Sequence, residues 1–440
     1  MSDNNKQESM LRITGYSDKF SARPGEEISF YVNSEFDEQY QADIVRLIHG
    51  DTNPEGPGYK EELVHSNISD MHAGKNQQIY GGSYIFVPNN EVFNVNSFTL
   101  CAYIYPTTPY VDVEGIEVGE QAILSKWDAE NETGYGLFVN SDGELCLKIG
   151  HGKGKVEEFS TGKPLYRKVW YKVGASFDVK TGKIFVFQTP YVTHTNSGHG
   201  MSMLHPKEDT QGIYQGTSLM GGPAVNDCPI LIASSTLKSK SGRFLSGGHF
   251  NYLDQPYEIP IHTQKYNGKI ERPKIANKAL ELHEIELLLS CQGIENIPNE
   301  LKEVVIGAWN FNANMTPNAS STKIIDDSLC KIDGCGINLP VRGVPGFNWS
   351  SDYMSFLHGP QEYGAIHFHD ESVDDARWDV SFKFKVPDNL KSGVYAARLR
   401  INRLTDSENE DYIPFFIRPA KDAKKANHKN ICTFFVKKLP

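Results

Sequence analysis

A chain of 440 residues is too long for one compact core, and at roughly 100–200 residues per domain it predicts two to four domains. The composition, 39% hydrophobic and 22% charged, is that of a soluble globular protein, and no run of about 18 apolar residues predicts a membrane span. A net charge of -11 argues against nucleic acid and anionic membranes as main partners, because both are bound largely through Lys and Arg.

The N-terminus and the cysteines indicate the compartment. The opening stretch, MSDNNKQESM, lacks the charged, apolar and small-residue regions of a secretory signal, so we expect a cytoplasmic protein. Seven scattered cysteines, an odd number in a long chain, predict free thiols rather than a disulfide scaffold. Cys330 and Cys335 are close in sequence, but without a second pair or a nearby His they do not predict a zinc site.

Short runs rich in Val, Ile, Phe, Tyr and Thr recur along most of the chain and predict a mainly β protein. Residues 27–32 follow a Pro-Gly turn and alternate as a strand, and residues 41–50 give another. Two or three strands cannot form a stable sandwich alone. They therefore need partners from elsewhere in the chain.

The stretch from residue 95 to about 289 carries the densest strand pattern. Residues 134–150 and 168–188 predict two hairpins, which turn at residues 140–143 and 180–182, and antiparallel strands of this kind pack as a sandwich. One further strand and a short helix follow, up to residue 289. Residues 189–229 interrupt the pattern and predict a loop that carries His194, His199 and His205.

Strand patterning resumes after residue 300 in three segments, GAIHFHD, WDVSFKFKVP and GVYAARLRI. We expect them to complete the sheet begun at residues 10–50. This gives a β-sandwich domain in two parts, residues 10–90 and 300–420, with the strand-rich stretch at 91–290 inserted between them. Residues 421–440 are then a linker and, in NICTFFV at 430–436, the first strand of a C-terminal domain that this sequence lacks.

His367, His369 and Asp370 lie in the densest cluster of titratable side chains. On a strand the two histidines share one face, two residues apart, which is a spacing that metal sites use. Acidic neighbours, including Asp370, could orient the imidazoles as an outer shell of a metal site. The alternative is that two histidines simply occupy the polar face of an antiparallel strand.

Tyr395 also has two interpretations. It ends a PDNLKSGVY segment of the kind that delivers a packed tyrosine to a late strand of a β-sandwich, where its hydroxyl bonds to nearby backbone. The functional alternative is a phenolate ligand to a hard metal such as Fe(III), whose charge displaces the phenol proton.

Residues 95–289 resemble a known module. FTLCAYIYP, QAILSKWD, GYGLFVNSDGELCLKIG, RKVWYKVGASFDVKTGKI and YNGKIERPKIANKALELHEI, in that order, are similar to a laminin-G/concanavalin-A-like jelly roll. The resemblance implies the fold, and it leaves open a non-catalytic binding protein that recognises carbohydrate or protein. Candidate stacking aromatics, each of which could equally be core, are Tyr103, Tyr105, Trp127, Tyr135, Trp170 and Tyr171.

The whole order of segments resembles the large (beta) subunit of N,N-dimethylformamidase, from about residue 11 to the end. RLIHGDTNPEGPGYKEE, the inserted module, GAWNF, PQEYGAIHFHD, SGVYAARLR and EDYIPFFIRP carry this resemblance. It implies a mononuclear ferric iron held by two tyrosines and one glutamate, with Tyr395 of the SGVYA segment matching the first tyrosine. It implies that the other two ligands belong to an α/β domain beyond residue 440, and that a small subunit is a partner.

The expected fold is therefore a discontinuous immunoglobulin-like β-sandwich with an inserted concanavalin-A-like jelly roll, ending in the first strand of a missing α/β domain. The expected function is the N-terminal part of an iron amidohydrolase that converts a formamide to formate and an amine. Because one phenolate cannot hold a catalytic iron, we expect no catalytic residue within this chain and no activity unless a separately encoded C-terminal piece supplies the other ligands. Tyr395 is the candidate iron ligand, with His367, His369 and Asp370 as possible outer-shell residues.

Overall fold

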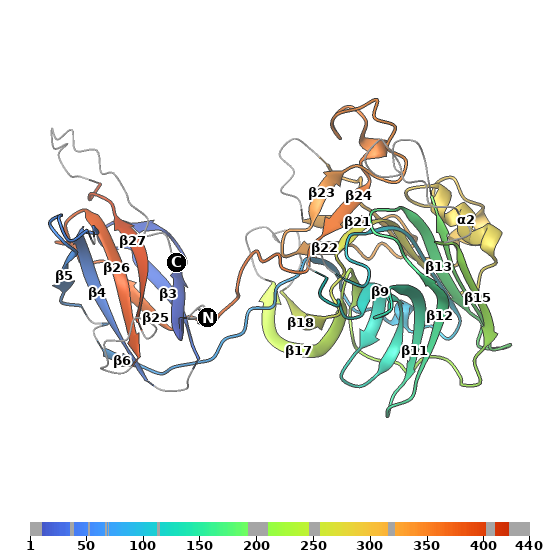
Figure 1. Ribbon diagram of the computed structural model, residues 1–440, viewed down its shortest axis with the longest axis horizontal. Helices are drawn as coiled ribbons and strands as arrows, with labels where there is room; N and C mark the ends of the chain where they lie inside the picture. Colours follow the sequence, from blue (N-terminus) through green and yellow to red (C-terminus); the bar gives the residue numbers. More distant parts are fainter. Residues whose placement is uncertain are drawn as a thin grey trace, which may run out of the picture. The chain divides into compact units, whose positions relative to one another are not determined.

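The computed structural model describes residues 11–35, 39–51, 53–66, 68, 70–111, 115–191, 210–245, 256–315, 322–401 and 410–421. The chain divides into two compact units (Figure 1). The first unit takes residues 1–79 and 376–440, and the second is the continuous stretch Tyr80–Asp375. No helix in the described part of the chain has the length and apolarity needed to cross a membrane.

The first unit is a sandwich of two sheets made from both ends of the chain. The three-stranded sheet has the order β1 (Ile13–Ser17), β3 (Glu27–Ser34) and β25 (Phe382–Lys385). The larger sheet has the order β2 (Ser21–Ala22), β27 (Glu410–Ile417), β26 (Gly393–Ile401), β4 (Tyr40–His49) and β5 (Lys60–Val64), with β6 (Asp70–His72) also beside β4. All these pairings are antiparallel except that of β2 with β27.

The core of the first unit lies between these two sheets. Strand β3 alternates strictly, and its inward side chains Ile28 and Phe30 are fully buried. Phe30 stacks on Phe382 of β25 and meets the edge of the Phe415 ring of β27. Because β3 and β25 are about 350 residues apart in sequence, this core holds the two ends of the chain together.

The second unit contains eighteen of the described strands and most of the helices. Its strands are β7 (Tyr84–Val87), β8 (Phe98–Pro106), β9 (Gln121–Asp128), β10 (Thr133–Val139), β11 (Glu144–His151), β12 (Val156–Pro164), β13 (Tyr171–Phe177), β14 (Lys183–Pro190), β15 (Gly212–Thr217), β16 (Ile230–Ile232), β17 (Ser235–Leu245), β18 (Tyr257–Thr263), β19 (Gly268–Ala276), β20 (Val305–Asn310), β21 (Lys323–Asp326), β22 (Gly334–Ile337), β23 (Val341–Val344) and β24 (Ala365–Phe368). Its helices are α2 (Leu282–Ser290), α3 (Asn299–Lys302) and the 3-10 turns η1 (Glu91–Phe93) and η3 (Pro360–Glu362).

These strands form two almost wholly antiparallel sheets, which the pairing of β20 with β21 joins into a nearly closed network. One sheet contains β7, β9–β12, β16–β18, β21 and β22, and the other contains β8, β13–β15, β19, β20, β23 and β24. A large apolar core fills the space between them. Helix α2 covers the outer face of β8 with Ile285, Leu288 and Leu289. This is the sandwich that the two hairpins at residues 134–150 and 168–188 predict.

The division between the units differs from the sequence expectation. WDVSFKFKVP and GVYAARLRI do pair with β3 and β4 of the first unit. GAIHFHD does not, because β24 pairs with β19 and β23 of the second unit. Residues 80–90 and 300–375 therefore belong to the jelly-roll unit, and the second part of the first unit begins at Ala376 rather than near residue 300.

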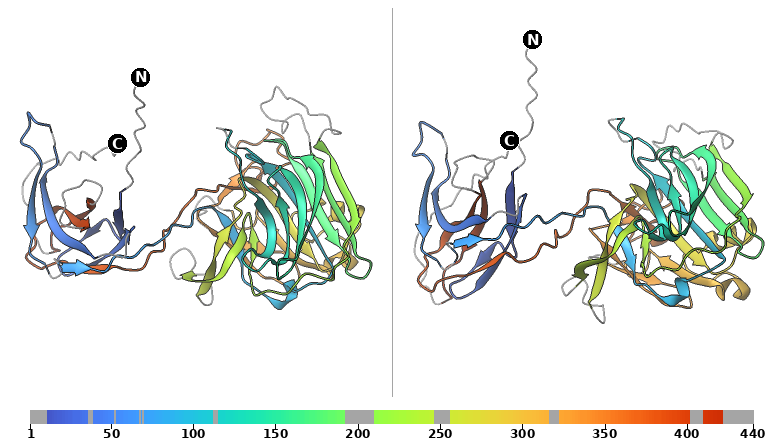
Figure 2. Two further views of the ribbon diagram at one scale, coloured as in Figure 1. Left: turned by 60° about the horizontal axis from the view of Figure 1, so that its bottom comes forward. Right: turned by 90° about the horizontal axis from the view of Figure 1, so that it is seen from below.

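Residues near 79 and 376 connect the units, and these connections run side by side in Figures 1 and 2. The backbone N–H of Asp379 donates to the side-chain oxygen of Gln77 at 2.8 Å. The strand expected at 430–436 and the loop histidines His194, His199 and His205 lie outside the described residues.

Candidate functional site

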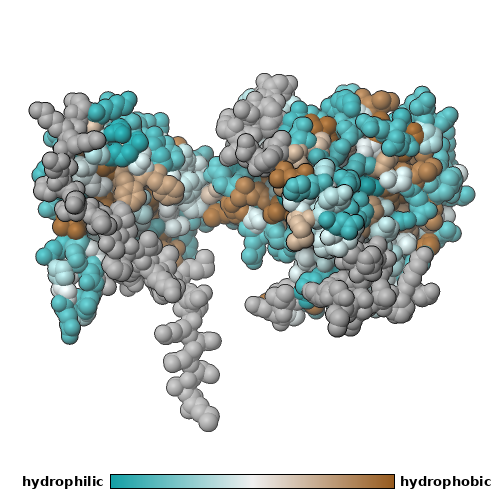
Figure 3. All heavy atoms as spheres, turned by 90° about the horizontal axis from the view of Figure 1, so that it is seen from above, coloured by the Kyte–Doolittle hydropathy of each residue, from teal (hydrophilic) through white to brown (hydrophobic). Residues whose placement is uncertain are grey.

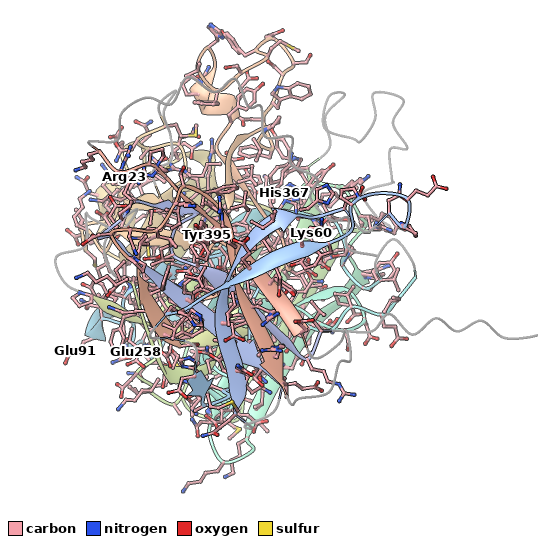
Figure 4. The ribbon with its side chains drawn as sticks, turned by 90° about the vertical axis from the view of Figure 1, so that its left-hand side faces the viewer. Arg23, Lys60, Glu91, Glu258, His367 and Tyr395 are labelled. Carbon is pink, nitrogen blue, oxygen red and sulfur yellow. The ribbon has the colours of Figure 1, made fainter. Side chains whose placement is uncertain are left out.

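Tyr395 lies in the interior of the first unit (Figure 4). Strand β26 presents its ring to the core, where it is 1% exposed and stacks on Phe415 with the ring centroids 6.0 Å apart. The phenol donates a hydrogen bond to the backbone carbonyl of Lys391, four residues upstream, at 2.6 Å. Burial raises the pKa of Tyr395, and the nearby Arg46 guanidinium opposes part of this rise. The hydroxyl is thus protonated and holds the turn that leads into β26.

The role of Tyr395 as an iron ligand stays a prediction. A mononuclear ferric centre needs several convergent oxygen or nitrogen donors. The one group of three or more His, Cys, Asp or Glu side chains close enough to share a metal, within the described ranges, is in the other unit. No step of a reaction is therefore assigned to iron on this chain.

His367 and His369 lie together at β24 in the second unit. Their rings are on the same face of the strand, with centroids 4.1 Å apart. The backbone N–H of His369 donates to Ser83, and the Asp370 carboxylate accepts from the Asn267 amide at 2.9 Å. Tyr395 belongs to the first unit and this pair to the second. A shared site between them stays a prediction.

The group that could hold a metal by distance alone is Glu120, Cys146 and Glu158. The Lys148 ammonium already forms ion pairs with both carboxylates and lies 5.8 Å from the centre of the Trp127 ring. Burial raises the pKa of the Cys146 thiol well above its ordinary value. Lys148, Glu120 and Glu158 thus form a salt-bridge network beside the Cys146 thiol.

Three buried charged side chains of the second unit were not expected from the sequence. On β19, Glu271 and Lys274 are buried; burial raises the pKa of Glu271 to about 7 and lowers that of Lys274 to about 8. On β9, burial lowers the pKa of Lys126 to about 8, and its ammonium donates to three neutral oxygens, on Asn89, Asn226 and Cys228, at 2.7–3.1 Å. The sequence signal was weak for Glu271 and Lys274, because they lie opposite Tyr103 and Cys101 of β8 on an outer sheet face that residues distant in sequence cover.

The aromatic residues considered for sugar stacking are mostly core. Tyr103, Trp127, Tyr135, Trp170 and Tyr171 are each at most 4% exposed. Tyr105 is half-buried and packs against Trp170. With their faces covered, these rings offer no platform for a carbohydrate. The sequence pattern alone could not make this distinction, because helix α2 and residues 345–348 cover an outer sheet face that alternation treats as exposed.

Two family models match the chain. Residues 80–199 match the concanavalin A-like lectin/glucanases superfamily, which agrees with the two-sheet sandwich of the second unit. Residues 341–434 match the family described as N,N-dimethylformamidase beta subunit-like, C-terminal. This second match runs across the boundary between the two units.

Curated relatives match almost the whole chain. The N,N-dimethylformamidase beta subunit of Paracoccus aminophilus is 34% identical over 416 residues, which cover 93% of this chain and 50% of that protein. The chain is a homologue of the N,N-dimethylformamidase beta subunit. The corresponding subunit of Alcaligenes sp is 32% identical over 94% of this chain and again 50% of that protein. This beta-subunit homologue therefore spans about half the length of the curated relatives it matches.

Among solved structures, the beta-subunit homologue is similar to a putative carbohydrate binding protein from Bacteroides ovatus. The match covers 80% of the homologue and 71% of the Bacteroides ovatus protein. The sequence identity is 13% and the TM-score is 0.33.

Proposed function

We propose that this chain supplies the β-rich half of a dimethylformamidase-like iron amidohydrolase, which converts a small formamide to formate and an amine. The observation that carries the proposal is the similarity of 93% of the chain to a dimethylformamidase beta subunit at 34% identity. Similarity over nearly the whole of both units is more specific than either fold, because β-sandwiches and jelly rolls serve many functions.

The proposal assigns no catalytic step to the described residues. Tyr395 is the one iron ligand that this chain would contribute. To bind iron, its phenol would have to lose its proton and its bond to the Lys391 carbonyl, which the metal's charge would have to offset. The remaining ligands would come from the half of the relatives that this chain does not match.

The same resemblance supports two partners. A small subunit of the dimethylformamidase type would complete a hetero-oligomer, and a C-terminal piece, encoded separately or in a continuing reading frame, would complete the iron site. The net charge of -11 does not favour nucleic acid or anionic membranes as alternatives.

The test compares this chain alone with a version extended through the downstream reading frame, each expressed with a small subunit. Iron content and hydrolysis of dimethylformamide are measured on both. We expect no bound iron and no turnover from the short form and both from the extended form. Iron with turnover in the short form would refute the claim that it is incompetent alone, and neither property in the extended form would refute the amidohydrolase proposal.

A further inference from the structure

His367 and His369 are directed away from the core of the second unit. Strand β24 alternates, so Ile366 and Phe368 are fully buried in the main core while the two imidazoles lie on the opposite face, each partly exposed. On that face His367 is opposite Lys269 of β19 and Val341 of β23. The pair is thus fixed on a central strand with a neighbour on each side.

The two rings are closer than their place on the strand requires. Residues two apart on a strand have α-carbons about 6.6 Å apart, yet these ring centroids are 4.1 Å apart with their planes inclined by 42°. A metal–nitrogen bond of about 2.0–2.1 Å places an imidazole centroid about 3.2 Å from the metal, so two rings at right angles around one ion have centroids about 4.5 Å apart. The observed separation is close to that of two adjacent ligands on one ion.

One ring nitrogen of the His367 side chain is unused in the described part of the fold. The Nε2 atom of His367 is buried and has no hydrogen-bond partner among the described residues. A neutral imidazole with an unused ring nitrogen is the form that binds divalent metals.

We propose that His367 and His369 form a two-histidine site for a divalent transition metal of the Ni²⁺, Cu²⁺ or Zn²⁺ class. Imidazole suits these ions, and adjacent ligands near 90° fit Ni²⁺ and Cu²⁺ best. The site is separate from the ferric centre of the proposed function and needs no residue outside the second unit.

A lysine opposite His367 should limit the affinity of the pair. The Lys269 ammonium donates to the Pro345 carbonyl at 3.1 Å and lies 5.1 Å from the centre of the Tyr105 ring. It has partners of its own, but its charge repels a cation. We therefore expect a site whose affinity rises when Lys269 is neutralised.

The test is titration of the tag-free full chain with NiCl₂ by calorimetry, repeated on H367Q, H369Q and K269Q. The matched control is H283Q, because His283 is an exposed histidine on α2. We expect the two histidine variants to lose one equivalent of Ni²⁺ or to bind it at least about tenfold more weakly, and H283Q to match the wild type. K269Q should bind about threefold more tightly or better. Wild-type isotherms from both histidine variants, or no gain in K269Q, would overturn the proposal.

A spectroscopic measurement keeps the test independent of folding. Electron paramagnetic resonance of one equivalent of Cu²⁺ should show coupling to two imidazole nitrogens in the wild type and to one in H369Q, whose side chain is partly exposed and whose loss leaves the strand pairing intact. Thermal unfolding without metal verifies that each variant is folded. The same two-nitrogen spectrum in H369Q would place the copper elsewhere and refute the site.

Discussion

The Tyr395 hydroxyl is a structural hydrogen-bond donor in this protein, and that role can be separated from iron binding. Removing it in Y395F leaves the ring stacked on Phe415 but leaves the Lys391 carbonyl without its donor. We expect the first unit to lose about 1–2 kcal/mol of unfolding free energy. Urea unfolding of this chain measures the loss.

Iron content then distinguishes the two roles of Tyr395. In a version extended downstream, a purely structural tyrosine predicts that Y395F keeps its iron once folded. A ligand predicts that the folded Y395F variant loses it. Full stability of Y395F in the chain of 440 residues would contradict a structural role for the Tyr395 hydroxyl.

Lys126 provides a second prediction at the scale of one side chain. Its folded pKa, about 8, is below the ordinary value of 10.5, so the native state binds fewer protons than the unfolded state between these limits. Stability from this group therefore rises as the pH increases from 8 to 10.5. Buried tyrosines and thiols have raised pKa values, so their contribution to stability falls at alkaline pH. Because both proteins share these groups, the difference in stability between the wild type and K126M isolates the effect of Lys126.

We expect the stability advantage of the wild type over K126M to grow across this pH range. At pH 7 it should already be about 1–2 kcal/mol, because K126M leaves the buried Cys228 carbonyl and two less buried oxygens without this donor. Urea unfolding at pH 7, 8 and 9.5 measures both quantities. K172M is the control, since the Lys172 ion pair with Glu286 is at the surface. A wild-type advantage that shrinks with pH would show that the Lys126 pKa is not lowered.

At the scale of elements, β19 concentrates the buried charge of the second unit. Pro273 lies at a bulge between Glu271 and Lys274, where Arg272 takes a positive φ of 54°. The bulge breaks the alternation and brings the Glu271 carboxylate against the Phe347 N–H at 3.1 Å. Phe347 in turn stacks face to face on Tyr103, with ring centroids 3.7 Å apart. This connects β19 to the segment that follows β23.

The raised pKa of Glu271 makes the stability of this region depend on pH. The ordinary value of 4.5 rises to about 7, so the native state binds more protons than the unfolded state between pH 4.5 and 7. The contribution of Glu271 to the unfolding free energy is complete below pH 4.5 and is lost as the pH rises through 7. Between these two pH values, the unfolding free energy of the wild type should fall by on the order of 3 kcal/mol relative to that of E271Q.

Urea unfolding of both proteins at pH 4.5, 6 and 7.5 tests this. The difference in unfolding free energy between the two proteins cancels the effect of His367. The lowered pKa of that residue changes stability in the opposite direction over the same pH range. A wild-type advantage that increases with pH would mean that Glu271 is ionised and stabilised in the fold.

The strands show how far the sequence determines this architecture. Period-two alternation gave the hairpins at β10–β11 and β13–β14 and the faces of β24, because alternation reports which side chains point inward. The alternation did not predict which strands pair with β24, because a strand with two inward apolar residues fits the edge of many sheets. Glu271 was missed for a related reason: its burial comes from the bulge and from residues 346–364, which are distant in sequence.

At the scale of the whole molecule, the second unit is an insertion whose two ends meet. The N–H of Gly82 donates to the Ser372 carbonyl at 2.8 Å, and that of Ser83 donates to His369 at 2.8 Å. On the other side of the boundary, Asp379 donates to Gln77. Each unit has its own core, and adjacent termini of this kind are what allow a domain to be inserted into another.

Residues 80–375 expressed alone should therefore fold, and residues 1–79 joined to 376–440 by a short Gly/Ser linker should fold separately. Each fragment is expected to unfold within a few degrees of one of two transitions in the full chain, because neither core takes apolar residues from the other unit. Differential scanning calorimetry of the three proteins measures this. A shorter fragment, residues 91–290, is the control. It lacks β7 and β20–β24, and three of these strands pair with β16 or β19 in the full unit. This fragment should therefore not unfold cooperatively. A single transition in the full chain, with both fragments unfolded, would show instead that the two units stabilise each other.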